Sequence, residues 1–503
     1  MKCISKLNKT DFIVLVVIVI IGLIHLPFPF DGDQAFFRLG ALEMQQGKVL
    51  YRDFWDIKQP GIFCFYFLAG TLFGFDEIGI HIFELIYMVF FSIILLLTLK
   101  SYFRHQIIAS LVPLLTVGVY YTVSGAWHLT QVEALVGFPL FICLWLTFKS
   151  FNNEGKQRFF LLLISGFLGG IVVLFKFILL LIVVALWLTI FMYSLVIKRH
   201  GIQKILLDTC LPIFIGIMLP LLVVASYFVW VNSFSIVYQT FFIYPPLIVT
   251  NTVFNKTNLI SGIKWFLQSF YPLILMAGVA VYVSLYKSKN TLTLLLFVWC
   301  IFGLGIIILQ RTALWQYHYL LLFVPIGILA TKGLDVLWDY LKELRSSIPT
   351  ILLIFLLFLP LSLTLIKKSA TLVNNNFALT EDTRLQYQAV FRKKYPSIHF
   401  EANFISRFGS IAGDIYVAGD PSIYYLSGRS QATILRGWAL EYFLSEQWSA
   451  LINQLDSSKP PYIFIDYEPQ AIIKENFPQM LEFVEQRYQM LHQSNNGIWY
   501  KIK

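Results

Sequence analysis

Residues 31–61 read DGDQAFFRLGALEMQQGKVLYRDFWDIKQPG and follow directly on a long apolar segment at the N-terminus. Five acidic and four basic side chains crowd into this stretch: Asp31, Asp33, Glu43, Asp53, Asp56, Arg38, Lys48, Arg52 and Lys58. Ionisable side chains beside lipid are costly and usually mark a functional site. The stretch therefore predicts a charged loop at a membrane surface, which is the first candidate site of the chain.

The composition around this loop is that of a membrane protein. Of the 503 residues, 58% are hydrophobic and only 13% are charged, against about 25% charged in a soluble protein. Apolar runs of roughly 17 to 25 residues, enough to cross ~30 Å of hydrocarbon, recur over the first three quarters of the chain. We predict a polytopic α-helical membrane protein with eleven spans, at residues 11–30, 78–99, 107–123, 132–148, 159–174, 177–197, 207–231, 265–286, 291–309, 317–333 and 349–366.

The chain divides by composition into two parts. Residues 1–366 form the predicted transmembrane domain, which contains the external loop 31–61. Residues 367–503 are predicted to form a small α/β domain outside the membrane, since their charges are regular and their apolar runs are short. Its expected strands lie at 414–420, 461–467 and 497–502, and its expected helices at 438–454 and 477–490. The apolar segment 59–74 is too short to span and is expected to dip into the interface or pack on the bundle.

The net charge of +10 comes almost entirely from the membrane part. Residues 367–503 contain 14 basic and 13 acidic residues, whereas residues 1–366 contain 24 and 15. This distribution argues against nucleic-acid binding. The excess lies in short loops, as the positive-inside rule produces, and it predicts a cytoplasmic N-terminus, formed by an uncleaved first span. Loop 31–61, the 232–263 connection and the C-terminal domain would then lie on the external face.

The residues after Asp33 have apolar side chains at helical spacing and predict an amphipathic helix at the interface. Asp31 and Asp33 then lie at the N-terminal end of that helix. There they either cap it or present a carboxylate to a ligand. The cations of the second half, Arg52 and Lys58, either bind a lipid phosphate or form ion pairs that hold the loop together.

Several segments in a fixed order resemble a known enzyme class. After the first span come G-D-[E/Q], a helix, G-x-x-x-Y-x-D and K-x-P-G; later segments are GFLGGIVVLFK at 166–176, QRTALWQYHY at 310–319, DIYVAGDPSIYYLSGR at 414–429 and PPYIFID at 460–466. Together they resemble the C-type (GT-C) membrane glycosyltransferases. These include the protein O-mannosyltransferases, the aminoarabinose transferase of lipid A and related bacterial membrane glycosyltransferases. The resemblance covers essentially the whole chain.

The resemblance implies a function. Such enzymes take a sugar from a polyprenyl-phosphate donor and transfer it to a lipid, glycan or protein acceptor on the external face, in bacteria at the plasma membrane. The family's catalytic acid falls on Asp33, where it would act as general base, whereas its following Glu is Gln34 here. The aminoarabinose subgroup has an Arg at the place of Phe36. Both departures argue against that particular substrate.

Further residues receive roles by the same resemblance and by their positions. Lys58 is the first choice for the donor phosphate, and the other candidates are Arg52, Lys176, Arg311 and His318. The alternative for Lys176 is that it reaches the interface only to keep its charge hydrated, and the alternative for the lone His318 is a satisfied interface residue. Glu133 is either a second acid-base group or a surface residue. Asp31 and Asp33 form a D-x-D pair that suits Mg²⁺ or Mn²⁺, although related enzymes often work without metal.

Two rival functions are compatible with this composition. A transporter or flippase of lipid-linked sugar would also need many spans and a charged cavity, but the charges cluster at one face and no inverted repeat is evident. A catalytically silent scaffold that binds cell-envelope polymer is the other alternative, and the missing Glu at position 34 favours it.

Overall fold

The computed structural model describes residues 7–251, 255–284, 286, 290–310, 314–343 and 348–503. The chain divides into two compact units. Unit 1 comprises the described parts of Met1–Leu26, His81–Ala225 and Phe254–Asn374, and unit 2 comprises those of Pro27–Ile80, Ser226–Val253 and Asn375–Lys503. Loop 31–61 therefore folds together with the C-terminal residues, although some 300 positions separate them.

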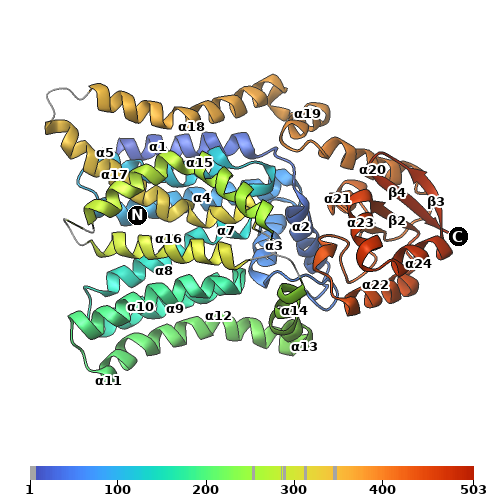
Figure 1. The fold of residues 1–503 in the computed structure, drawn as a ribbon, viewed down its shortest axis with the longest axis horizontal. Helices are drawn as coiled ribbons and strands as arrows, with labels where there is room; N and C mark the ends of the chain where they lie inside the picture. The colour runs from blue at the N-terminus through green and yellow to red at the C-terminus, as the bar shows by residue number, and fades with distance from the viewer. Residues whose placement is uncertain (1–6, 252–254, 285, 287–289, 311–313, 344–347) are drawn as a thin grey trace. The chain divides into compact units, whose positions relative to one another are not determined.

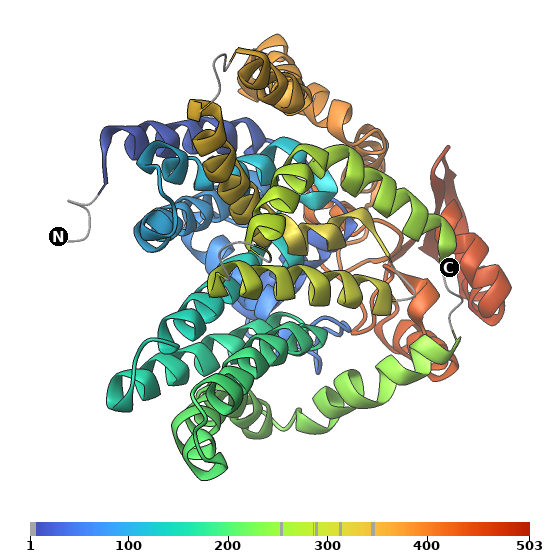
Figure 2. The ribbon, with the colours of Figure 1, turned by 60° about the vertical axis from the view of Figure 1, so that its left-hand side comes forward.

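Unit 1 is a helical bundle. Its α-helices, which belong wholly or mostly to this unit, are α1 (Lys9–His25), α4 (Glu77–Leu99), α5 (Gln106–Ser110), α6 (Val119–Val123), α7 (Val132–Leu135), α8 (Gly137–Ser150), α9 (Gly155–Phe175), α10 (Leu180–Met192), α11 (Ile202–Ile205), α12 (Leu211–Trp230), α15 (Lys256–Val283), α16 (Thr291–Leu309), α17 (Phe323–Glu343) and α18 (Ile348–Asn374). Shorter 3-10 or π turns are η2 (Lys100–Tyr102), η3 (Leu114–Gly118), η4 (Ala126–His128), η5 (Phe177–Leu179), η6 (Tyr193–Ile197), η7 (Leu206–Cys210) and η10 (Gln316–Leu322). The long helices run side by side in both views, for example α8 with α9 and α15 with α17 (Figures 1 and 2).

The predicted fold class is confirmed. In the described part of the chain, nine helical segments are long and apolar enough to cross a membrane, and each coincides with one of the eleven predicted spans. The predicted span 11–30 forms α1, of 17 residues. The predicted span 107–123 is divided among α5, η3 and α6, with a π-helical turn at its centre. The protein is an integral membrane protein with a small C-terminal sheet.

Glycines let two helices of unit 1 approach closely. A Cβ at Gly166 on α9 would lie 2.4 Å from the carbonyl oxygen of Ile213 on α12, and a Cβ at Gly216 would lie 2.2 Å from that of Leu163. Small residues facing one another allow such close backbone packing where lipid offers no hydrophobic driving force. The glycine-rich segment 166–176 thus has a packing role, and Lys176 follows directly on the end of α9.

A buried lysine holds α18 to the bundle. The Lys368 ammonium donates hydrogen bonds to the carbonyl oxygens of Tyr121 and Ser124, at 2.9 and 2.6 Å, and lies 3.1 Å from His25 Nε2. Almost none of the rest of the span Ile354–Asn374 is buried within the unit, as expected for a helix that faces lipid. A charge in such a helix is tolerated because backbone oxygens satisfy its donors.

Unit 2 combines the first loop with the C-terminal residues. Its elements are α2 (Gly32–Gln45), α3 (Pro60–Phe73), α13 (Phe234–Tyr238), η8 (Gln239–Ile243), α14 (Tyr244–Asn251), η11 (Asn376–Ala378), α19 (Glu381–Phe391), α20 (Tyr395–Phe408), β1 (Tyr416–Ala418), α21 (Ser422–Ser427), η12 (Leu440–Tyr442), α22 (Ser445–Ser458), β2 (Tyr462–Asp466), α23 (Tyr467–Asn476), α24 (Gln479–Arg487), β3 (Tyr488–Gln493) and β4 (Gly497–Ile502). The apolar segment 59–74 forms α3, whose 14 residues reach about 21 Å and which packs on α2.

The sheet of unit 2 has the strand order β1-β2-β4-β3. β1 and β2 are parallel, with Val417 opposite Phe464, and β2 pairs antiparallel with β4, with Phe464 opposite Trp499. The predicted strands at 414–420, 461–467 and 497–502 are thus found. The predicted helix 477–490 is too long, because α24 ends at Arg487 and the chain continues as the edge strand β3.

Candidate functional site

The first turn of α2 positions the acidic residues of the charged loop. Asp31 is the N-cap: its carboxylate accepts from the Gly32 N–H at 2.7 Å, and Gln34 Oε1 accepts from the Asp31 N–H at 2.6 Å. This reciprocal arrangement is a capping box, so Gln34 has a structural role. Arg392 donates to Asp31 at 3.1 Å and to the carbonyl oxygen of Phe30 at 2.6 Å, which fixes the start of the helix from the C-terminal part of the unit.

Asp33 lies two residues after the N-cap, and its carboxylate makes different contacts from that of Asp31. Its Oδ1 accepts a hydrogen bond from Trp438 Nε1 at 2.9 Å, and its Oδ2 lies 3.8 Å from the Lys58 ammonium. The side chains of Asp33 and Lys58 keep 22% and 26% of their surface exposed. Asp31 therefore caps the helix, whereas Asp33 presents a partly exposed carboxylate beside a cation.

The segment that carries Trp438 fits closely over α2. A Cβ at Gly32 would lie only 2.0 Å from the Trp438 indole, so only glycine allows the ring to reach Asp33. The next residue, Ala439, has a φ of +56°, which is left-handed. A non-glycine residue pays for this conformation in backbone strain, and such strain gathers at functional sites.

A second, fully buried cation lies beside Asp33. Arg436 pairs with Asp56, and the two side chains are only 3% and 1% exposed. Burial lowers the pKa of Arg436 to about 10, against the opposing effect of Asp33 and Glu441. Burial also raises the pKa of Glu441 above its ordinary value and that of Tyr442 to about 12. The Arg436 Nε–H is buried without a hydrogen-bond partner among the described residues.

Arg52, a predicted phosphate ligand, has a different environment. Its guanidinium donates two hydrogen bonds to Asp53, at 2.9 and 2.8 Å, and one to the carbonyl oxygen of Val231 at 3.2 Å. These contacts match the alternative in which the loop's charges pair with one another. Both contacts of these cations are ion pairs within the loop, close for Arg52 with Asp53 and longer, at 3.8 Å, for Lys58 with Asp33; phosphate binding by either cation stays a prediction.

Unit 1 contains a second polar cluster at the ends of its helices. Lys176, in extended backbone after α9, donates hydrogen bonds of 2.6 Å to Glu133 Oε1 and to Gln310 Oε1. His318 Nε2 lies 3.7 Å from the same Glu133 oxygen. Glu133 and His318 are each only 2% exposed. The predicted site residues Glu133, Lys176 and His318 therefore lie together, and Glu133 holds Lys176 in place. Arg311, another predicted phosphate ligand, lies outside the described residues.

The predicted D-x-D pair does not converge on one point. Asp31 is turned to its own helix and to Arg392, and Asp33 is turned to Trp438 and Lys58. Among the residues that the structure describes, no group of three or more His, Cys, Asp or Glu side chains is arranged to hold a metal ion. A divalent ion at Asp31 and Asp33 stays a prediction from the sequence.

Comparison with known proteins identifies the fold. The chain matches ArnT from Cupriavidus metallidurans bound to undecaprenyl phosphate with a TM-score of 0.59 and 12% identity, over 98% of each chain. It matches the apo state of the same protein with a TM-score of 0.58 and 10% identity, over 97% of each chain. The chain thus has an ArnT-like GT-C fold, as the sequence motifs predicted. No family model and no curated protein matches its sequence.

The Asp33 cluster consists of Asp33, Lys58, Trp438 and Arg436. The sequence did not reveal its last two members, which belong to the segment ATILRGWAL at 432–440, about 400 positions after the loop. A lone Arg within an apolar run is the signal that marks it, because a buried charge needs a partner. No local pattern indicates that this partner is Asp56.

Proposed function

We propose that the protein is a glycosyltransferase that moves a sugar from a polyprenyl-phosphate donor to an acceptor on the extracytoplasmic face of the membrane. The acceptor class, whether lipid, glycan or protein, stays open. The observation that carries the proposal is the partly exposed Asp33 carboxylate, held by Trp438 with Lys58 at 3.8 Å. The ArnT-like fold supports it, since ArnT is known with undecaprenyl phosphate bound.

The proposed reaction uses the two partly exposed side chains, Asp33 and Lys58. An acceptor hydroxyl attacks the anomeric carbon of the donor sugar as the bond from that carbon to the phosphate oxygen breaks. Asp33 takes the proton of the hydroxyl as general base. The polyprenyl phosphate leaves with the electron pair of the broken bond, and Lys58 stabilises its developing charge. The 3.8 Å between Lys58 Nζ and Asp33 Oδ2 is longer than a hydrogen bond. The ammonium can therefore turn toward a phosphate without breaking a hydrogen bond to Asp33.

The other predicted residues receive supporting roles. Arg436, with a buried N–H that lacks a partner among the described residues, adds positive potential beside Asp33. Lys176 and His318 stay candidates for the donor phosphate, and Arg52 is a weaker one because Asp53 engages it. The contacts of Glu133 favour a role in positioning Lys176.

We expect Lys58→Ala to raise the KM for the polyprenyl-phosphate donor about tenfold or more, because a charge-assisted contact to phosphate is lost. Initial rates at varied donor concentration in proteoliposomes measure this effect. Lys58→Arg should restore most donor use, and Lys474→Ala, which removes an exposed lysine of the same unit, should leave the KM unchanged. An unchanged KM in Lys58→Ala would remove Lys58 from the phosphate site.

The proposed topology has a cytoplasmic N-terminus and unit 2 on the external face. We expect an alkaline phosphatase fused to the C-terminus to be active in intact bacteria and a green fluorescent protein fused there to be dark. Bright fluorescence together with an inactive phosphatase would reverse the orientation and place Asp33 in the cytoplasm.

A further inference from the structure

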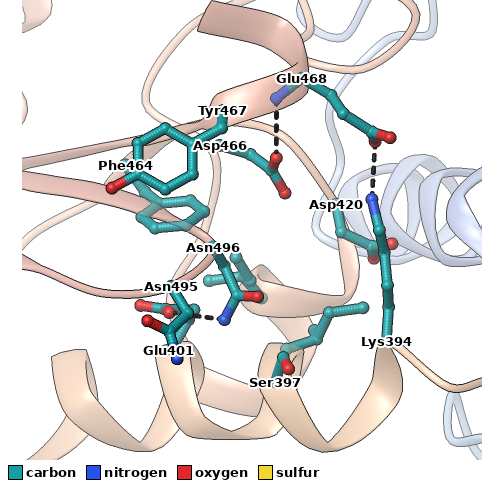
Figure 3. A pocket seen from close by; sticks show the side chains of 12 residues that line it. Lys394, Ser397, Glu401, Asp420, Phe464, Asp466, Tyr467, Glu468, Asn495 and Asn496 are labelled. Atoms are coloured by element: carbon teal, nitrogen blue, oxygen red, sulfur yellow. Dashed lines mark hydrogen bonds and ion pairs between the residues drawn. The ribbon is translucent and has the colours of Figure 1, made fainter.

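A small cavity lies within unit 2 at the carboxyl edge of its parallel strands. Its volume is about 180 Å³, below the range of roughly 300 to 1,000 Å³ for drug-sized ligands. Asp420 lies two residues after the end of β1, and Asp466 is the last residue of β2. α20 supplies Ser397 and Glu401 from below, and the β3–β4 turn supplies Asn495 and Asn496 (Figure 3). Sheets with parallel strands characteristically bind ligands at this edge.

The lining is polar and carries a negative balance. It contains four carboxylates and a single ammonium: Glu401, Asp420, Asp466, Glu468 and Lys394. A phosphate or a carboxylate ligand would be repelled by this charge, whereas hydroxyl groups, which donate hydrogen bonds, would be attracted. The cation of the lining, Lys394, is already bonded to Glu468 at 2.7 Å, whereas the Lys58 ammonium lies 3.8 Å from the Asp33 carboxylate.

The carboxylates of the lining differ in how many hydrogen bonds they already accept from the protein. Glu401 accepts hydrogen bonds from Ser494, Asn496 and Trp499, so its role is structural. Among the described residues, the hydrogen bond recorded for the Asp466 carboxylate is the one that its Oδ1 accepts from the Glu468 N–H at 3.1 Å, as the N-cap of α23. Its carboxylate retains acceptor capacity toward the cavity.

Two further features of the rim suit a small polyol. The carboxamide of Asn495 is exposed and offers both donors and an acceptor. Tyr467 is 36% exposed, while its hydroxyl already donates a hydrogen bond to the Ser494 carbonyl oxygen at 3.0 Å. An exposed ring face beside carboxylate and amide groups can pack against the C–H face of a pyranose.

The cavity is joined to the Asp33 helix by one arginine. Arg392 binds Asp420, which lines the cavity, and also Asp31, which caps α2 two residues before Asp33. These contacts all lie within unit 2. An acceptor that reaches from the cavity toward α2 would thus be held by the same framework that positions Asp33.

From this geometry we infer that the cavity binds one uncharged, hydroxyl-rich sugar unit of the acceptor, with Asp466 and Asn495 as its principal hydrogen-bonding groups. That the bound sugar belongs to the acceptor rests on the proposed function. Saccharide binding by the cavity does not depend on sugar transfer. It narrows the acceptor to a glycan or a glycosylated molecule and makes the C-terminal residues its recognition element.

The test is a binding measurement on the full chain in lipid nanodiscs, without donor. Neutral oligosaccharides, such as chitotriose and maltotriose on an array of neutral glycans, should bind, and acidic ones such as trigalacturonate should not. Asp466→Asn should weaken binding about tenfold or more, because a charge-assisted acceptor is lost, while Asn keeps the N-cap of α23. Asn495→Ala should weaken binding to a smaller extent.

The matched control is Asp456→Asn, which removes a half-exposed carboxylate of α22 that pairs with Arg487. It should bind like the wild type, and all variants should keep the wild-type melting temperature. Binding of no neutral saccharide, preference for acidic ones, or equal affinity in Asp466→Asn would overturn the inference. A protein that binds neutral glycans but leaves the donor intact would retain this inference and refute the proposed function instead.

Discussion

Asp33→Asn is expected to lower sugar transfer by at least about 100-fold, the lower end of what a general base contributes. Asparagine has the same shape and can still accept the Trp438 hydrogen bond through its amide oxygen. It cannot take up a proton from the acceptor hydroxyl. Because Asp31 caps the helix, the substitution should leave α2 and the folded unit intact. Radiolabelled sugar transferred per minute, by the variant and the wild type in proteoliposomes, measures the effect.

The control for this variant removes the same charge elsewhere in unit 2. Asp76 is exposed and caps the start of α4 through the Gly79 N–H. Asn is an equally good cap, so Asp76→Asn should transfer sugar at the wild-type rate. Transfer by Asp33→Asn within about a factor of two of the wild type would mean that another group serves as the base.

Arg436→Met is expected to destabilise unit 2 by about 3–5 kcal/mol, because it leaves the Asp56 carboxylate buried without its partner. Both side chains are almost fully buried, so water cannot replace the lost interaction. The double variant Arg436→Met, Asp56→Leu should be less destabilised than the single one, since it removes both charges together. The free energy of unfolding in denaturant, followed by the fluorescence of Trp438 and its neighbours, measures both.

An exposed ion pair provides the comparison for this prediction. Arg487 and Asp456 lie 3.2 Å apart and are 60% and 48% exposed. Arg487→Met should therefore cost at most about 1 kcal/mol, as is usual for surface pairs. If Arg436→Met were no more destabilised than Arg487→Met, the Arg436–Asp56 pair would not hold the C-terminal segment against the first loop.

Much of the fold was predictable because long apolar runs have few alternatives in lipid. Every span from Glu77 onward with an uninterrupted apolar run has its counterpart in the structure. The run 107–123 was harder, since its π-helical turn at Leu114–Gly118 leaves no mark in hydrophobicity. The edge strand β3 was missed because most of its residues are exposed, so they show no alternation of apolar and polar side chains.

The candidate site was predictable only in part. Asp33 and Lys58 lie in one loop, so the sequence placed them close together, and the order of the helices brought Glu133, Lys176 and His318 into one cluster. Contacts between Asp33 and Trp438, or between Asp56 and Arg436, join residues about 400 positions apart. No local pattern encodes such pairs. The sequence alone did not explain why Gln34 departs from the family pattern. In the structure, its side chain accepts a hydrogen bond from the Asp31 N–H and so helps to cap α2.

The central claim is that this cluster cleaves a sugar from a lipid phosphate. The most direct measurement incubates the purified protein in proteoliposomes with radiolabelled polyprenyl-phosphate sugars and an envelope glycan extract, and follows the donor by chromatography. We expect free polyprenyl phosphate to appear together with labelled glycan, and neither to appear with Asp33→Asn. Donor that crosses the bilayer with its sugar still attached would instead identify a flippase, and donor left unchanged would contradict the enzymatic account altogether.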